Sequence, residues 1–450
     1  MVSNEQINRL GKRILLSNGK LENSDLKELQ DFRLSFYEPM RDTFNRLVMI
    51  KSQVRTSAIV AFRLKRISTI INKVFREEKM KLSRMGDVAG LRMIFDNDTE
   101  VFKARDLILK EFDLSGKIRD YIDNPKPIGY RGLHIYVKDR KTGKRIEIQL
   151  RTVKHHNWST LVEITDFIYG TRLKELGYDS DPEFAEFHSL MSSDKELEKQ
   201  EAELIYKVLE KRDFINKLSN LFRRNSAKVR AQWNPKMSKN KYFLIEASKT
   251  SFPIITGYKN YSKAEEDYFK KYKESDETEI VLATINKPTF SQLSLAYSNY
   301  ILSYHTFISD AEDIIKNLAI RALEDKKVSR FKNIFCTYET IQSNVLLGIV
   351  SDSFSTIVST TRNGQLTVTS DRKITRSDLN KFLKRLNSSL ASRTSKHKHF
   401  MQELELYIPN SKYSKWRCEK FLKSHDKRIS KILKEQTISV DNQSDKQLLI

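Results

Sequence analysis

The residues best suited to chemistry lie between positions 119 and 152 of the 450-residue chain, in the segment RDYIDNPKPIGYRGLHIYVKDRKTGKRIEIQLRT. Near its end, apolar residues at positions 146, 148 and 150 alternate with Arg145, Glu147, Gln149 and Arg151. A period of two predicts an extended strand with one apolar face and one charged face. Polar side chains two positions apart on a strand lie about 7 Å from each other, which suits groups that bind successive parts of one phosphate-bearing ligand.

A second alternating stretch stands directly before this one. Apolar positions 133, 135 and 137 alternate with His134 and Tyr136, and the connecting stretch KDRKTGK contains Gly143, so we expect two antiparallel strands joined by a tight turn. His134 would then lie near the charged face of the other strand. The preceding loop is stiffened by two prolines, and Gly129 lets its backbone turn close to a ligand. An ordinary half-exposed hairpin in a basic protein would show the same pattern.

Two carboxylates far apart in the sequence are candidates for one metal site. Asp87 lies just before LRMIF (91–95), which we expect to be a mostly buried strand, and Glu147 lies within the strand described above. At about 4 Å and an effective dielectric of about 20, two such charges repel by about 4 kcal/mol, a cost that a bound Mg²⁺ reverses. Taken singly, Asp87 would serve equally well as a helix cap or as a partner of Arg84.

The charge balance points to an anionic partner. Lys and Arg number 81 against 58 Asp and Glu, which gives a formal net charge of +23. This excess favours nucleotides or RNA, and less strongly an anionic membrane. The two cysteines, Cys336 and Cys418, indicate neither a disulfide framework nor a cysteine zinc site. The start of the chain lacks an apolar signal segment and no later run reaches about 20 apolar residues, so we expect a cytoplasmic protein with no membrane partner.

Five segments carry a resemblance to a known family. They are RLKRISTIINK (63–73), LSRMGDVAGLR (82–92), RDYIDNPKPIGYRGLH (119–134), IEIQLRT (146–152) and HNWSTLVE (156–163). Each is short, but in this order they resemble the synthetase domain of the RelA/SpoT alarmone (ppGpp) synthetases, and most of all the small alarmone synthetase-like proteins and toxic synthetases. The resemblance implies an α/β fold with a nucleotidyltransferase-like mixed sheet flanked by helices. It also implies a pyrophosphokinase of the GTP diphosphokinase type, with ATP as donor and Mg²⁺ as cofactor.

Such an enzyme would transfer the β,γ-pyrophosphate of ATP to the ribose 3′-hydroxyl of GDP or GTP and so make (p)ppGpp. By position, the resemblance implies a catalytic group of Asp87, Glu147, Gln149 and Arg151. Of these, Asp87 and Glu147 would hold Mg²⁺, and Glu147 would help to hold it or orient and deprotonate the attacking hydroxyl. ATP would be bound by Arg63, Lys65, Lys73 and Arg92. The acceptor would be bound by Arg119, Lys126, Gly129, Tyr130, His134 and His156, with Tyr130 stacked on its base. Phosphoryl-type transfer depends on charge neutralisation and positioning, which these residue types supply.

The acceptor side departs from the family pattern at two positions. The chain has Ile128 where the family commonly has asparagine, and Gly132 where a serine is frequent. These changes leave the identity of the acceptor open. One alternative is the same chemistry on the 3′ CCA end of tRNA, a tRNA modification that would make the protein a growth-arrest toxin or a phage-defence effector. An alternative of another class is a catalytically inactive sensor that binds nucleotide or RNA.

We expect five parts along the chain. Residues 1–24 are a helical lead, 25–180 the RelA/SpoT-like domain and 181–235 a helical segment. Residues 238–326 are expected to form a small α/β domain for regulation or interaction. Residues 327–450 are expected to form a basic region with helices and a hairpin between 354 and 369, and His425 is expected at its surface. Aromatic residues interleaved with the basic ones, among them Tyr413 and Trp416, suit RNA, although a solvated helix face explains them equally. A protein partner or activator could also bind there.

Overall fold

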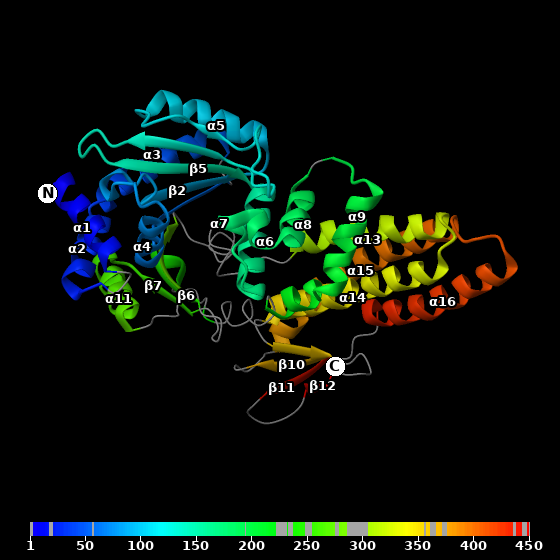
Figure 1. Cartoon of the computed structure of the whole chain (residues 1–450). Helices are drawn as coiled ribbons and strands as arrows, with labels where there is room; N and C mark the ends of the chain where they lie inside the picture. The colour runs from blue at the N-terminus through cyan, green and yellow to red at the C-terminus, as the bar shows by residue number, and fades with distance from the viewer. Residues whose placement is uncertain are drawn as a thin grey trace. The chain divides into compact units, whose positions relative to one another are not determined.

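The computed structural model describes residues 3–17, 21–55, 58–193, 195–221, 232, 237–247, 254–274, 279–285, 305–354, 357–360, 366–370, 376–434, 438–442 and 448–449. The chain divides into two compact units (Figure 1). The first comprises residues 1–159 and 233–300, and the second comprises residues 160–232 and 301–450. The boundaries at 159 and 300 do not coincide with the ends of the domains expected from the sequence.

A mixed eight-stranded sheet forms the centre of the first unit, in the order β3-β4-β5-β2-β1-β8-β6-β7. Its first five strands are β3 (Arg119–Asp120), β4 (Leu133–Lys138), β5 (Arg145–Thr152), β2 (Ala89–Phe95) and β1 (Ile59–Leu64). Strands β2 and β5 run parallel, whereas the pairs β3-β4, β4-β5 and β1-β2 are antiparallel. The mixed sheet and the hairpin predicted from the alternating pattern are thereby confirmed.

Strand β5 shows what the alternation means physically. Ile146, Ile148 and Leu150 are fully buried in the hydrophobic core of the first unit. The opposite face is covered as well, because Glu147 is only 7% exposed and Arg151 only 5%. Buried charged groups are tolerated when their hydrogen bonds are satisfied. This face must therefore carry an ordered polar network rather than an open charged surface.

Helices before and between these strands pack around the sheet. They are α1 (Asn4–Leu16), α2 (Asn23–Leu34), α3 (Tyr37–Val54), α4 (Ile67–Arg76) and α5 (Asp98–Glu111), with the short helix η1 (Leu82–Arg84). Another short helix of this unit, η3 (Met237–Lys239), comes later in the chain. Helix α1 begins with a capping box in which Ser3 and Gln6 exchange hydrogen bonds. Helices α3 and α5 pack against β2, and α1 packs against α2 and α4. Their apolar side chains join the same core as β5.

The strands of residues 233–300 extend this sheet. Strand β6 (Tyr242–Ala247) pairs with β7 (Ile254–Tyr258) and with β8 (Glu279–Ile285), and β8 pairs antiparallel with β1 at positions 61–63. Helix α11 (Tyr261–Glu274) packs against all three strands. The α/β domain expected at 238–326 is therefore divided, since its strands belong to the first unit and its last helix, α13 (His305–Glu324), to the second. Alternation alone cannot specify this pairing, because every sheet edge offers the same N–H and C=O groups.

The second unit is largely helical. It contains most of α6 (Val153–Tyr169), then α7 (Leu173–Leu176), η2 (Gly177–Asp179), α8 (Pro182–Ser192), α9 (Lys199–Lys211), α13, α14 (Val328–Phe354), α15 (Arg376–Glu405) and α16 (Lys412–Lys434). A small sheet has the order β12-β11-β10-β9, with β9 (Ile357–Thr360), β10 (Leu366–Ser370), β11 (Ile438–Asn442) and β12 (Leu448–Leu449). Strands β9 and β10 are antiparallel, which confirms the expected hairpin, while its turn lies outside the described residues.

Polar side chains lie inside the bundle of the second unit. His425 of α16, expected at the surface, is buried, and its Nδ1 lies 2.5 Å from Oε2 of Glu339 on α14. Its position inside the bundle follows from the helical period, which places it on the same face as the buried Leu422 and Ile429. Within the described part of the chain, no helix has the length and apolar character needed to cross a bilayer.

Candidate functional site

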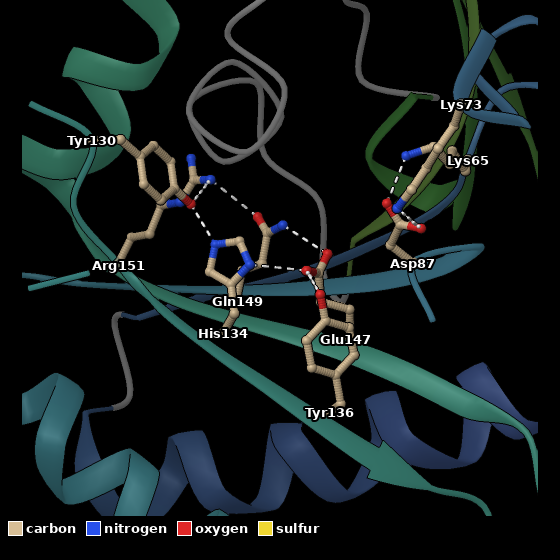
Figure 2. A network of polar contacts seen from close by, with 9 residues as sticks. All are labelled: Lys65, Lys73, Asp87, Tyr130, His134, Tyr136, Glu147, Gln149 and Arg151. Carbon is tan, nitrogen blue, oxygen red and sulfur yellow. Dashed lines mark hydrogen bonds and ion pairs between the residues drawn. The ribbon is translucent and has the colours of Figure 1, made fainter. Parts of the chain in front are cut away.

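Strands β4 and β5 bring polar side chains to one face of the sheet. In their antiparallel register, His134 lies opposite Gln149 and Tyr136 lies opposite Glu147. Residues directly opposite each other on such strands have Cβ atoms about 4.5–5.5 Å apart. Figure 2 shows these side chains on one side of the strands, with Arg151 beside them.

The carboxylate of Glu147 is the centre of this network. Its Oε1 accepts hydrogen bonds from Tyr136 Oη and from His134 Nδ1, both at 2.9 Å, and its Oε2 accepts one from Gln149 Nε2 at 2.8 Å. Burial would raise the pKa of Glu147, but the three donors, led by His134, outweigh burial and lower that pKa to about 2. Glu147 is therefore ionised at neutral pH despite being buried.

A line of hydrogen bonds connects Glu147 with the loop residue Tyr130. An ionised carboxylate can only accept, so His134 donates through Nδ1, and its Nε2 accepts from the Tyr130 hydroxyl 2.5 Å away. Burial lowers the pKa of His134 although Glu147 acts in the opposite direction, so the ring is neutral, as this line requires. Arg151 Nη2 donates to Tyr130 Oη (2.7 Å) and to Gln149 Oε1 (3.1 Å), which closes the network.

Asp87 forms a second cluster, with two lysines. Lys65 Nζ lies 2.7 Å from Asp87 Oδ2, and Lys73 Nζ lies 2.9 Å from Asp87 Oδ1. Burial would raise the pKa of Asp87, yet the charges and hydrogen bonds of the two ammonium groups lower it. Lys65 follows β1, Lys73 lies on α4 and Asp87 precedes β2, so three segments converge here. The structure thus brings together three residues that were predicted for ATP and metal binding.

Tyr136 donates a hydrogen bond to Glu147 and also senses the charge of Asp87. Asp87 contacts Lys65 and Lys73, whereas Glu147 contacts His134, Tyr136 and Gln149, and Figure 2 shows these two groups as separate clusters. Burial raises the pKa of Tyr136, and the negative charges of both Glu147 and Asp87 act in the same direction. The two clusters are therefore electrostatically connected across this phenol.

The residues predicted to bind the acceptor surround Tyr130. The Nζ of Lys126 lies 5.3 Å from the centre of the Tyr130 ring, and Arg151 Cζ lies 5.0 Å from it. Gly129 has a φ of +90°, which favours glycine, and its N–H donates to the carbonyl oxygen of Lys126 at 2.7 Å. Two cations therefore lie over the ring that is predicted to stack on a base.

The remaining predicted residues lie on neighbouring elements. Arg119 lies on β3 with its Cζ 5.7 Å from the centre of the Tyr136 ring. Arg92 of β2 stands opposite position 149 in the parallel register of β2 and β5. His156 is buried in α6, directly after β5. Arg63 lies in β1, and only its backbone is described. The roles of these four residues remain predictions.

Gly132 makes room for the contact between Arg151 and Tyr130. Its φ is +154°, and a Cβ at this position would lie 3.2 Å from Arg151 Cγ, 3.4 Å from the carbonyl oxygen of Leu150 and 3.5 Å from Tyr130 Oη. Both the backbone angle and the space favour glycine. The departure from the family's serine therefore has a structural reason in this loop.

Asp87 and Glu147 fit a hard divalent cation as partial ligands. Both are ionised carboxylates, and carboxylate oxygens are ligands that Mg²⁺ prefers. Among the described residues, no three or more His, Cys, Asp or Glu side chains converge into a metal site. Mg²⁺ is usually held by one or two carboxylates together with waters and substrate phosphates. The residues thus fit a cation that binds together with phosphates.

Two aromatic residues of the site were missed by sequence reasoning. Tyr136 donates to Glu147, and Tyr121 packs edge-on against Tyr130 and His134, with ring centres 5.6 and 5.4 Å apart. The strand period could have found Tyr136, because it follows His134 by two positions and so shares its face. Nothing in the loop sequence indicates the position of Tyr121.

Comparison with known proteins agrees with the motifs. Residues 62–172 match the family model described as "Region found in RelA / SpoT proteins". The GTP pyrophosphokinase YwaC of Bacillus subtilis (strain 168) is 31% identical over 112 residues, which cover 22% of this chain and 53% of that protein. The Arabidopsis thaliana protein named "Probable GTP diphosphokinase RSH3, chloroplastic" is 30% identical over 161 residues, which cover 33% of this chain and 22% of that protein.

A solved structure is also similar. The small alarmone synthetase 1 of Bacillus subtilis, crystallised with its product pppGpp, has 21% identity and a TM-score of 0.32, over 42% of this chain and 97% of that one. The chain spans about half the length of YwaC and about a fifth of the Arabidopsis relative. Residues 62–172, which carry both carboxylate clusters, are thus similar to the region found in RelA and SpoT proteins.

Proposed function

We propose that the chain is a pyrophosphokinase that transfers the β,γ-pyrophosphate of ATP to the ribose 3′-hydroxyl of GDP or GTP. The 3′-oxygen bonds to the β-phosphorus, the bond from that phosphorus to the oxygen bridging to the α-phosphorus breaks, AMP leaves, and the hydroxyl proton passes to solvent. The observation that carries the proposal is the pair of ionised carboxylates, Asp87 and Glu147, beside adjoining strands of the RelA/SpoT region. The names of the relatives, GTP pyrophosphokinase and GTP diphosphokinase, agree with it.

The donor side would be served by the Asp87 cluster. Asp87 holds the ammonium groups of Lys65 and Lys73 at 2.7 and 2.9 Å, so it positions two cations on one side of the sheet. Phosphoryl transfer needs little covalent help but much neutralisation of phosphate charge, which such cations provide. Mg²⁺, held by Asp87 and Glu147, would neutralise further charge on the transferred group.

The acceptor hydroxyl would be oriented by Glu147. An ionised carboxylate has about four acceptor positions, and the hydrogen bonds from His134, Tyr136 and Gln149 use three of them. The remaining position is on Oε2, where Glu147 would either help to hold Mg²⁺ or accept a hydrogen bond from an incoming hydroxyl. Because strands β4 and β5 hold the three donors, the carboxylate is fixed before the acceptor binds, and such positioning is a large part of catalysis.

Transfer to the 3′ CCA end of tRNA is the second candidate. It is favoured by the changed acceptor loop, in which Ile128 is buried and Gly132 accommodates Arg151, and by the net charge of +23. A terminal ribose offers the same hydroxyl as GDP, so the carboxylate clusters would serve either acceptor. Modified tRNA could not be charged, and growth would stop. A catalytically inactive sensor that binds nucleotide or RNA is the remaining alternative.

One labelling experiment separates these functions. The purified chain is incubated with Mg²⁺ and ATP labelled at the γ-phosphate, with GDP, GTP and deacylated tRNA offered in parallel. Label on GDP or GTP supports the proposal, label on tRNA selects the second candidate, and label on neither supports the sensor. We expect Glu147→Gln to abolish transfer, whereas Glu77→Gln, at an exposed carboxylate, leaves it intact. Near-normal transfer by Glu147→Gln would remove Glu147 from the mechanism.

A further inference from the structure

Helix α16 has one buried face and one exposed face. Its buried side chains are Cys418, Leu422, His425 and Ile429, and the helix packs against α14 and α15 within the second unit (Figure 1, red). The apolar face is therefore occupied by the protein itself. Any partner of this helix must bind its outer face.

Two large aromatic side chains are exposed near the start of that outer face. Tyr413 is 68% exposed and Trp416 is 55% exposed, with ring centres 6.5 Å apart and ring planes inclined by 29°. Lys420 Nζ lies 5.0 Å from the centre of the Trp416 ring, and Arg417 Cζ lies 5.5 Å from the centre of the Tyr413 ring. One cation therefore lies over each ring, while more than half of each aromatic side chain stays exposed. Two large aromatic rings exposed next to each other are available to stack with a ligand.

Three lysines continue the line of the two rings. Tyr413, Trp416, Lys420, Lys423 and Lys427 follow the spacing i, i+3, i+7, i+10 and i+14, which places them along one side of a helix. At about 1.5 Å per residue, the lysines rise in steps of about 4.5 and 6 Å. Along one strand of a duplex the phosphates rise by about 3.4 Å each, so lysines at this spacing can each reach a different phosphate. All three lysines are exposed.

Basic residues strongly outnumber acidic residues on α16. Lys or Arg occupies positions 412, 415, 417, 420, 423, 427, 428, 431 and 434, against two acids, Glu419 and Asp426. Both acids have cationic or imidazole partners, since Glu419 lies 3.9 Å from Lys415 Nζ and Asp426 lies 2.9 Å from His397 Nε2. Neither acid lies on the line of five residues. The outer face therefore offers two aromatic platforms followed by a run of positive charge.

We propose that this face, Tyr413, Trp416, Lys420, Lys423 and Lys427, binds a single-stranded RNA segment. Unpaired bases would stack on the two rings, and the lysines would contact the phosphates that follow. Base stacking on aromatic side chains combined with a basic track is the usual way to bind single strands. An acidic protein would satisfy the lysines but would leave the paired rings without a partner. The proposal concerns binding alone and does not depend on the transfer reaction proposed above.

Fluorescence anisotropy with the full chain tests this proposal. The probe is a fluorescein-labelled, unstructured 20-nucleotide RNA of mixed sequence, titrated at several salt concentrations, with duplex RNA and polyaspartate as competitors. Trp416→Ala is compared with Trp416→Phe, which keeps an aromatic face, and with Tyr178→Ala, an exposed tyrosine of the second unit outside α16. A triple change of Lys420, Lys423 and Lys427 to Gln is compared with the same change at Lys103, Lys195 and Lys211, which are exposed elsewhere.

We expect Trp416→Ala to raise the Kd about tenfold, Trp416→Phe to raise it less, and Tyr178→Ala to leave it unchanged. The triple change on α16 should reduce the slope of log K against log salt by about 2, because each phosphate contact with a single strand contributes about 0.7. The α16 variants should keep the transfer to GDP or GTP proposed above, so loss of transfer and loss of binding are distinguishable. The proposal is overturned if the chain does not bind the probe, if the α16 variants bind no more weakly than their matched controls, or if duplex RNA or polyaspartate competes equally well.

Discussion

The hydroxyl of Tyr130 lies 2.5 Å from Nε2 of His134, and the same oxygen accepts a hydrogen bond from Arg151. The side chain predicted to stack on the acceptor base is therefore also one end of the hydrogen-bonded line that reaches Glu147. Its ring and its hydroxyl have separable roles. The ring would contact the base, while the hydroxyl holds His134 and Arg151 in place.

Two substitutions at Tyr130 should separate these roles. Tyr130→Phe keeps the ring but leaves the buried nitrogens of His134 and Arg151 without this partner, so we expect kcat to fall about tenfold with little change in acceptor KM. Tyr130→Ala also removes the stacking face, and we expect the acceptor KM to rise at least tenfold while the ATP KM changes little. Initial rates with each substrate varied in turn measure both effects. Equal losses for ATP and acceptor in Tyr130→Ala would contradict the stacking role.

A serine at position 132, frequent in the family, should not be tolerated here. Gly132→Ser places a Cβ 3.2 Å from Arg151 Cγ on a backbone with a φ of +154°, so the loop or Arg151 must move. We expect the free energy of unfolding to fall by about 1–2 kcal/mol and acceptor use to fall with it. Urea unfolding and acceptor KM measure these effects.

Gly90→Ala is the matched control for stability. It also adds one Cβ to a glycine beside β5, but no atom lies within 4 Å of that position. We expect its unfolding midpoint to remain near that of the unaltered chain. If Gly132→Ser were as stable as Gly90→Ala and used GTP better, the loop would have adopted the family conformation and our account of Gly132 would be wrong.

Local sequence patterns predicted the centre of the site better than its surroundings. Alternation placed Glu147, Gln149 and Arg151 on one face, and the short turn placed His134 next to them, because both follow from the period of a strand and the length of a hairpin loop. The same period does not predict which residues cover that face. Tyr130 and Tyr121 do so from a loop, and their contacts depend on tertiary packing.

The sequence failed more clearly at the far edge of the sheet. Residues 238–326 were expected to form a separate small α/β domain, whereas β8 pairs with β1 at positions 61–63, near Lys65, which follows β1. A helical arginine such as Arg33 likewise looks like a surface residue in a sequence, because its burial depends on helix α11, more than 200 positions away. Contacts between residues so far apart in the chain leave no pattern in the local sequence.

We expect Arg33 to position Lys65, which is predicted to bind ATP. It is 1% exposed, its Nε donates to the carbonyl oxygen of Lys65 at 2.7 Å, and its Cζ lies 4.5 Å from the centre of the Tyr268 ring. The backbone N–H of Lys65 donates to the carbonyl oxygen of Val88 at 2.8 Å. Both the N–H and the carbonyl group of Lys65 are therefore hydrogen-bonded. Arg33→Lys keeps the positive charge but loses the planar guanidinium group with its fixed N–H donors. We expect the free energy of unfolding to fall by about 2–4 kcal/mol and the ATP KM to rise severalfold.

The change Arg41→Lys is the matched control, because Arg41 lies on the neighbouring α3, is exposed and contacts Glu38. It should leave both quantities nearly unchanged, as expected for a surface ion pair. Substrate kinetics under conditions where each variant is fully folded separate the two effects of Arg33. A normal ATP KM in folded Arg33→Lys would restrict Arg33 to a role in stability.

Glu265 of α11 should make the first unit less stable as the pH rises. Its Oε1 is buried and, among the described residues, has no hydrogen-bond partner. Burial raises the pKa of Glu265 from 4.5 to about 7, although the charge of Arg33 acts against this. A carboxyl group with a raised pKa favours the folded state fully below pH 4.5, and this contribution is lost as the pH rises through 7.

Glu265→Gln stays neutral, so we expect it to match the unaltered chain at pH 4 and to be about 1–3 kcal/mol more stable at pH 8, allowing for partial solvent screening. Urea unfolding at both pH values measures the difference, and Glu266→Gln, its exposed neighbour, should show none. A stabilisation by Glu265→Gln that is equal at pH 4 and pH 8 would show that the gain comes from packing and that the carboxyl group does not titrate in this range.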